Sequence, residues 1–208
     1  MPIFRNELVQ SAARKNRLNK ARLTRAETNG LSRRVRRIKT VEWKTHATFI
    51  EIDGLHNGAI SAAVKELSIK HPDRKLNTLD FGCGDGTAAK QVAKNNKLNV
   101  FGFSIDSSEA WLKPEGVTFL QTAVDVLPTF LRKNKINLDI VYERASLKYL
   151  PPSKQVSVLE KLSSVLNVGG RVFVDSIYAE PRYVSALQRS GYSVEVNKIF
   201  IVSLTKVR

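Results

Sequence analysis

Short apolar runs alternate with helical, amphipathic stretches through the last three quarters of the chain. Strands are predicted at 76–81, 99–105, 117–121, 138–143, 171–177, 193–197 and 199–207, and helices at 57–70, 88–95, 108–112, 127–133, 153–166 and 181–190. Strands that alternate with helices are typical of a parallel sheet covered on both faces. The last two strands follow each other almost without a connection, so they must be antiparallel to each other. The sequence therefore predicts an α/β fold with a doubly wound, mostly parallel seven-stranded sheet.

A strongly basic segment precedes this pattern. The 208-residue chain has a net charge of +15, and its first 44 residues hold 13 Lys and Arg against 3 acidic residues. Helical spacing predicts two basic helices, at 6–27 and 31–41, so we expect a helical arm at 1–44 and one domain at 45–208. Three interpretations of the arm stay open: a solvated cap helix, an Arg-rich organelle transit peptide, or a surface in residues 5–44 that binds RNA or another polyanion.

Composition narrows the class of protein further. The hydrophobic fraction of 42% is ordinary for a globular protein, and no apolar run reaches the roughly 18 residues of a membrane span. Cys83 is the one cysteine, which excludes an intrachain disulfide and a cysteine zinc cluster. The three histidines have no metal-ligand spacing, so no metal site is expected. These features favour a reducing, cytoplasmic location.

The most informative motif follows the first predicted strand. It reads Asp80-Phe81-Gly82-Cys83-Gly84-Asp85-Gly86, with glycine at every second position before a helix begins. Glycine is needed where the backbone turns at positive φ and comes close to a ligand. The third glycine of a dinucleotide-binding turn is replaced by Thr87, and the lysine of a phosphate-binding loop is missing. The run resembles the first motif of class I S-adenosylmethionine (SAM)-dependent methyltransferases.

That resemblance implies a site at the carboxyl ends of the strands. In this family the glycine turn passes under the methionine part of SAM and the acid, here Asp80, helps to hold its amino group. The resemblance thus assigns cofactor contacts to Asp80, Gly82, Cys83, Gly84 and Gly86.

The next two strands depart from the family pattern. Ser104 stands where an acid normally binds the ribose, and Asp106 lies two residues later on the same side of the strand. Asp106 could equally cap the helix that follows. Ala123 stands where an acid normally meets the adenine, with Asp125 again two residues late. Ser104, Asp106 and Asp125 are therefore cofactor-binding candidates in a pocket that is either shifted or degenerate.

The fourth strand resembles the family segment that ends at the methyl acceptor. It ends in Glu143-Arg144, where Glu143 is the candidate proton acceptor or substrate-orienting group and Arg144 the candidate acceptor contact; a surface salt bridge between the two is the alternative. The segment lacks the Asn/Asp-Pro-Pro-aromatic signature of enzymes that methylate exocyclic amines on bases. Gly169-Gly170 matches the family turn before the fifth strand, and we expect it to reverse the chain from helix into strand.

Two functions remain open from the sequence. The first is a SAM-dependent methyltransferase whose acceptor is RNA, another anionic molecule recruited by the arm, or a small molecule. The second is a methyltransferase-like module with a weakened pocket that binds nucleic acid or a protein. The intact glycine turn favours the first, and the displaced acids near 104 and 123 favour the second.

Overall fold

The computed structural model describes residues 47–104, 116–144, 146–175, 181–196 and 202–208. The predicted basic helices, the helical turn at 108–112 and the boundary between arm and domain lie outside these residues. Within the described residues, no helix is both long and apolar enough to cross a lipid bilayer.

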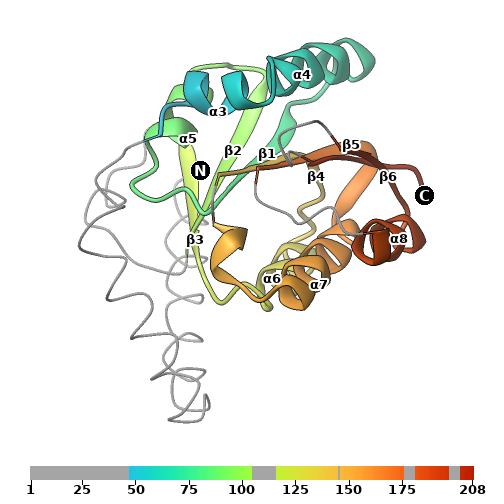
Figure 1. Cartoon of the computed structure of the whole chain (residues 1–208). Helices are drawn as coiled ribbons and strands as arrows, with labels where there is room; N and C mark the ends of the chain where they lie inside the picture. Colours follow the sequence, from blue (N-terminus) through green and yellow to red (C-terminus); the bar gives the residue numbers. More distant parts are fainter. Residues whose placement is uncertain (1–46, 105–115, 145, 176–180, 197–201) are drawn as a thin grey trace.

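A seven-stranded sheet forms the centre of the molecule (Figure 1). Its strands are β1 Leu76–Phe81, β2 Leu98–Ser104, β3 Val117–Gln121, β4 Leu138–Glu143, β5 Leu166–Val174, β6 Tyr192–Val196 and β7 Val202–Lys206. The spatial order is β3-β2-β1-β4-β5-β7-β6, and β7 runs antiparallel to β5 and β6 while the other pairs are parallel. The predicted doubly wound, mostly parallel sheet is confirmed, including its reversed ending.

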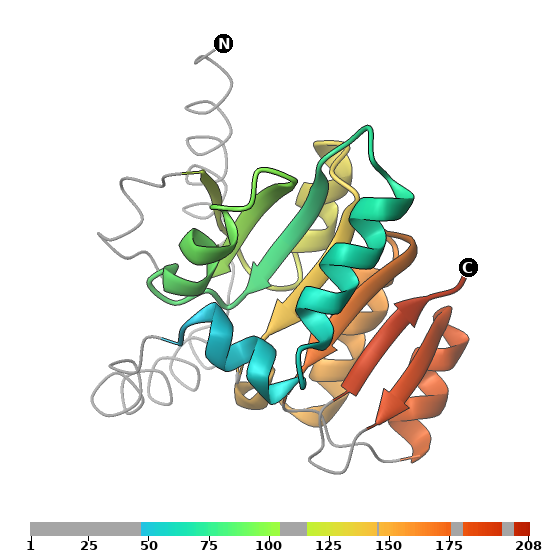
Figure 2. The same ribbon diagram turned by 90° about the horizontal axis from the view of Figure 1, so that it is seen from above.

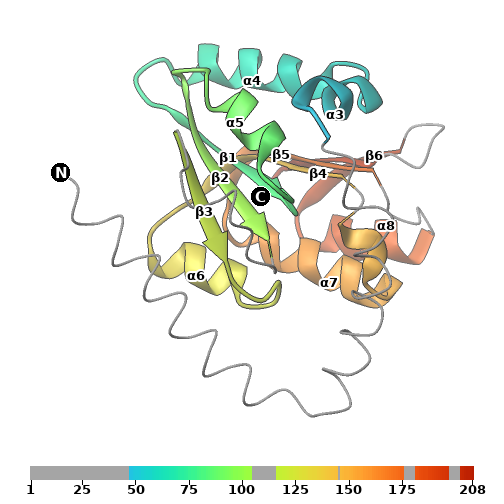
Figure 3. The same cartoon turned by 90° about the vertical axis from the view of Figure 1, so that its left-hand side faces the viewer.

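Helices cover both faces of the sheet, as Figures 1 and 3 show. One face carries α3 Phe49–Leu55, α4 Ala59–Lys70 and α5 Thr87–Val92, and the other carries α6 Leu127–Lys133, α7 Pro152–Ser163 and α8 Pro181–Arg189. A 3₁₀ turn, η2 Leu147–Tyr149, follows β4. Since both faces are covered, β1 and β4 are buried along nearly their whole length.

Several predicted boundaries were wrong. The helix expected from 57 begins at Ala59, because Asn57 and Gly58 have positive φ, and a separate helix, α3, precedes it. The helix expected to reach 166 ends at Ser163, and the strand begins at Leu166 instead of 171. Gly169-Gly170 therefore lies inside β5, where the pairing with β4 shifts between Leu138 and Ile140.

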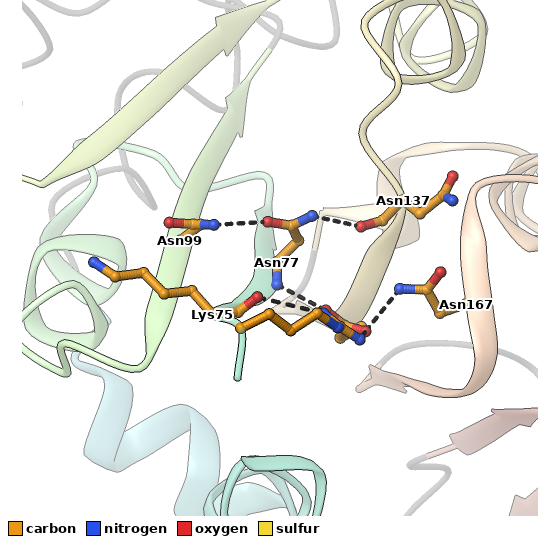
Figure 4. A network of polar contacts seen from close by, with 7 residues as sticks. Lys75, Asn77, Asn99, Asn137 and Asn167 are labelled. Carbon is orange, nitrogen blue, oxygen red and sulfur yellow. Dashed lines mark hydrogen bonds and ion pairs between the residues drawn. The ribbon is translucent and has the colours of Figure 1, made fainter. Parts of the chain in front are cut away.

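A polar network holds the amino ends of the central strands together (Figure 4). Arg74 donates two hydrogen bonds of 2.7 Å to the buried carboxylate of Asp139, which also accepts the backbone N–H of Asn77 and the side-chain amide of Asn167. Burial by itself would raise the pKa of Asp139, but these hydrogen bonds and the charge of Arg74 hold it below its usual value. This network of Arg74, Asn77, Asp139 and Asn167, here called the clasp, is thus structural. It lies at the end of the sheet opposite to the carboxyl edge, where a ligand would bind.

Candidate active site

The central strands end together at the carboxyl edge of the sheet. Phe81, at the end of β1, pairs in register with Phe103 of β2 and with Glu143 of β4. The chain order reverses between β1 and β4, which is where open α/β sheets bind their ligands. Figure 2 shows α3 crossing the carboxyl ends of these central strands. The elements therefore converge on one edge, and the predicted site residues in the described part of the chain lie on it.

The loop after β1 is held against β2. The backbone N–H groups of Gly82 and Cys83 both donate to the carbonyl of Phe103, at 2.8 and 2.9 Å. A Cβ added to Gly82 would overlap the side chain of Ser146, and one added to Gly86 would lie 2.6 Å from the ring of Phe119. The protein itself therefore occupies the space beside these two glycines.

Gly84 is different from its two neighbours in the loop. Its φ is +54°, and a Cβ built there would meet nothing within 4 Å. The backbone at this position therefore borders open space, and a side chain would project into that space. This is the cradle that a cofactor running over the loop needs.

Asp80 lies beneath the loop in an unusual state for a carboxylate. It is 4% exposed, and its Oδ2 atom has no hydrogen-bonding partner. Burial raises the pKa of Asp80 to about 7; the hydroxyl of Tyr142 and the backbone N–H of Ala89 act in the opposite direction, and the charge of Asp85 adds to the rise. A buried carboxylate oxygen without a partner is a place where a cationic group would be stabilised.

Tyr142 is the register partner of Asp80 on the adjacent strand β4. Its side chain is fully buried and meets the ring of Phe49 edge-on at 5.7 Å. The hydroxyl interacts with the Asp80 carboxyl but falls short of full hydrogen-bond geometry, so this buried oxygen also lacks a hydrogen-bonding partner. The carboxyl group of Asp80 and the hydroxyl group of Tyr142 therefore lie beside each other, and neither has a hydrogen-bonding partner of good geometry.

Cys83 contributes backbone and bulk rather than thiol chemistry. It is buried in the loop, and burial together with the charge of Asp80 raises the pKa of its thiol far above the ordinary value. Reactivity requires the thiolate, so this thiol is inert near neutral pH. Its small side chain packs beside Gly102, whose Cβ would lie 3.1 Å from the sulfur.

Of the three candidates for binding the ribose and adenine of the cofactor, the structure describes Ser104 and Asp125. Ser104 is buried at the end of β2 and pairs in register with Gln121 of β3. Asp125 is exposed in the turn that leads to α6, and Asp106 lies outside the described residues. Ser104 thus lies on the same edge as the glycine loop, whereas the contacts of Asp106 and Asp125 with a cofactor stay predictions.

Glu143 ends β4 with its carboxyl group turned toward its own chain. It accepts the backbone N–H of Ser146 and, at 2.7 Å, that of Leu147, which holds the turn into η2. The side chain is 1% exposed, and burial, together with the charge and hydrogen bond of Asp175, raises its pKa to about 8. A carboxyl group in this state carries a proton at neutral pH.

Arg144 pairs with α3 rather than with Glu143. Its guanidinium lies 3.8 Å from the carboxylate of Glu51, on a partly exposed surface. The contact ties the loop after β4 to the helix that crosses the carboxyl edge. The catalytic roles assigned to Glu143 and Arg144 stay predictions.

A histidine that the sequence did not single out lies close to this edge. His56 follows α3 and is 3% exposed, and both of its ring nitrogens lack a hydrogen-bonding partner. Its ring meets that of Phe173 edge-on at 5.5 Å, two residues before Asp175 on β5. No group of three or more His, Cys, Asp or Glu residues in the described part of the chain is arranged to hold a metal ion.

Sequence reasoning missed Tyr142, His56 and Asp175. Tyr142 lies in a predicted strand, but only the pairing of β1 with β4 reveals its position beside Asp80. Asp175 falls inside a strand predicted to continue to 177, whereas β5 ends at Val174. Nothing around His56 in the sequence marks it as part of a site.

Comparisons with known proteins agree with the fold. No family model and no curated protein sequence matches the chain. Among solved structures, SAM-bound CalS10, an amino pentose methyltransferase from Micromonospora echinaspora, is similar with a TM-score of 0.56 and 12% identity, over 85% of this chain and 97% of that chain.

Two further structures extend this likeness. A TehB-like SAM-dependent methyltransferase from Corynebacterium glutamicum has a TM-score of 0.53 and 14% identity, over 87% of this chain and 98% of that chain. The SAM-bound magnesium protoporphyrin IX methyltransferase of Synechocystis has a TM-score of 0.51 and 17% identity, over 78% and 86% of the two chains. The chain therefore has the class I methyltransferase fold.

Proposed function

We propose that this protein is a SAM-dependent methyltransferase. The observation that carries the proposal is the glycine loop, where Gly84 borders open space four residues after Asp80, whose buried carboxylate oxygen Oδ2 has no hydrogen-bonding partner. SAM has a cationic amino group beside its sulfonium centre, which matches a buried carboxylate in need of a positive partner. The sulfonium would supply an activated methyl group, so the protein's main task is to align donor and acceptor.

The residues in place fit the methionine half of the cofactor. Asp80 would receive the amino group, with Tyr142 beside it, and the backbone at Gly84 would lie against the methionine chain. Ser104 would face the ribose from the end of β2. The structural neighbours include a methyltransferase for an amino pentose and one for magnesium protoporphyrin IX, which supports a small-molecule acceptor.

The role of the basic arm is a separate part of the proposal. Residues 5–44 would recruit RNA or another polyanion through their clustered Lys and Arg side chains. The support is the charge of this segment alone, so the acceptor itself can be RNA or a small molecule.

The rival function is a binding module with a weakened pocket. Its support is that Ser104 takes the place of an acid and that Asp125 is exposed to solvent. An intact methionine subsite argues for the enzyme, because a buried, unpartnered carboxylate is costly to keep in a module that does not use it.

Cofactor binding tests the proposal through a matched pair of glycine substitutions. Gly84 and Gly58 both have positive φ and open space where a Cβ would point, so Gly84→Ala and Gly58→Ala carry a similar backbone strain. Calorimetric titration with SAM should show an affinity at least about tenfold weaker in Gly84→Ala and unchanged in Gly58→Ala. Equal affinities in the two variants would mean that SAM binds away from Gly84 or does not bind at all.

A further inference from the structure

A second polar group lies on the carboxyl edge, apart from the cofactor loop. Its members are His56 after α3, Glu143 at the end of β4 and Asp175 directly after β5. Asp175 follows Val174, the register partner of Glu143, so the two carboxyls are neighbours across adjacent parallel strands. Their interaction is direct, because Asp175 hydrogen-bonds with the buried Glu143 carboxyl.

His56 is the unexplained member of this group. A histidine that only packs in a core donates or accepts at least one hydrogen bond. Here both ring nitrogens are buried and unpartnered, while the ring rests against Phe173, two residues before Asp175. Burial lowers the pKa of His56, and the charges of Asp175 and Asp53 act against that shift. The imidazole is therefore neutral at physiological pH and able to take up a proton.

The charged groups around the imidazole are mostly acidic. Asp53 is already engaged, since it accepts the backbone N–H groups of Ile60 and Ser61 at the start of α4. The cation nearest to Glu143 in sequence, Arg144, is paired with Glu51. Asp175 is thus the carboxylate best placed to work with His56, and the surroundings favour a cationic ligand over an anionic one.

We propose that Asp175 and His56, next to the carboxyl of Glu143, form the proton-accepting part of the methyl-acceptor site, and that the acceptor reacts through an aliphatic amine. The inference rests on the proposed methyltransferase function. It favours a small amine over RNA as the acceptor, because the nucleophiles of RNA do not carry a positive charge that this acidic edge would select.

An amine needs such a group because it arrives as an ammonium ion without a free electron pair. The ammonium donates one proton to the carboxylate of Asp175, and the proton passes on to the imidazole of His56. The freed electron pair of the nitrogen then forms a bond to the methyl carbon. The carbon–sulfur bond breaks with its electron pair going to sulfur, which leaves an N-methylated amine and S-adenosylhomocysteine. One proton remains on the protein and is released to water.

The first test needs no acceptor and follows the histidine rings of the full chain by NMR as the pH is varied. The signal of His56 is assigned through His56→Gln. We expect a midpoint below the usual histidine range in the wild type and a further fall of about half a pH unit or more in Asp175→Asn, because a favourable negative charge is lost. Asp73→Asn, on the opposite edge, is the matched control and should not move it. If Asp175→Asn leaves the midpoint of His56 unchanged, the proposed pairing of Asp175 with His56 is wrong.

The second test measures methyl transfer from radiolabelled SAM to benzylamine, benzyl alcohol, benzoate and total RNA. We expect label in benzylamine alone, and a kcat at least about tenfold lower in Asp175→Asn that recovers as the pH approaches the pKa of the amine. A merely structural role would not give that recovery. Label in benzoate or RNA, no label in the amine, or full activity of Asp175→Asn contradicts the inference. Failure of SAM to bind at all would instead contradict the proposed function, and calorimetry separates the two.

Discussion

Replacing Asp80 by asparagine should make the free protein more stable while it removes cofactor binding. Burial raises the pKa of Asp80 to about 7 in the folded chain, against an ordinary pKa of 3.8 in the unfolded chain. Folding is therefore favoured most at low pH, and this advantage is lost as the pH rises from about 4 through 7. Asparagine has the same shape and cannot ionise, so the variant escapes the loss.

The size of the effect follows from the shift in pKa. The rise in the pKa of Asp80 from 3.8 to about 7 corresponds to roughly 4 kcal/mol between the two protonation states, which is the upper limit of the gain in stability of Asp80→Asn at pH 8. For a chain of this length, a gain of even half that size raises the melting temperature by about 4 to 8 °C. At pH 4 the two proteins should melt together, because Asp80 is then protonated.

Thermal unfolding at pH 4 and pH 8, with and without SAM, checks both halves of the prediction. The wild type should gain stability from SAM at pH 8, whereas Asp80→Asn should not, since the ammonium has lost its counter-charge. Asp85→Asn, in the same loop, tests whether removal of any acid has this effect. A variant less stable than the wild type at pH 8, or one that SAM stabilises equally, would refute the reasoning.

Two other predictions concern the clasp and the arm. Asp139→Asn leaves Arg74 without its ion pair and should lower the free energy of unfolding by about 2–3 kcal/mol in urea titrations. Because the pKa of Asp139 is depressed in the folded chain, the wild type should also lose stability as the pH falls below the ordinary pKa of an aspartate. A variant as stable as the wild type at pH 7 would contradict the stabilising role of this network. Deletion of residues 1–40 should weaken RNA binding and flatten its dependence on salt in filter-binding assays, and an unchanged affinity would remove the arm from the account.

The sheet could be predicted because its signals are local. The strands are rich in apolar residues, and Gly82 after β1 and Gly116 before β3 mark two of their ends, so β1, β3 and β4 have the bounds expected from sequence. Helix α3 carries a local signal too, a capping box in which Thr48 accepts the backbone N–H of Glu51 while the Glu51 carboxylate accepts that of Thr48. It was missed because the segment is short and follows the basic arm.

The start of β5 could not be read in the same way. Gly169-Gly170 is typical of a turn, but the pair lies within a strand whose register shifts against β4. A Cβ at Gly170 would lie 2.8 Å from the carbonyl oxygen of Asn167, so glycine is required by close packing inside the bulge. Sequence shows that glycine is needed there, and only the pairing shows why.

The candidate site, like the sheet, could be predicted only where its signal is local in the sequence. The motif from Asp80 to Gly86 is contiguous, so the sequence reveals it. The partners of that motif come from other strands: Tyr142 reaches Asp80 through the pairing of β1 with β4, and His56 reaches β5 because α3 crosses the carboxyl edge. These contacts depend on strand register and tertiary packing, which the spacing of residues along the chain does not reveal.

The most direct test of the central claim is a calorimetric titration of the wild-type protein with SAM and, separately, with S-adenosylhomocysteine. We expect micromolar binding of both at pH 8, with one molecule per chain. We also expect that SAM binding at pH 6 releases protons to the buffer, because the ammonium favours the ionised form of Asp80. Correctly folded protein that binds neither molecule would contradict the account.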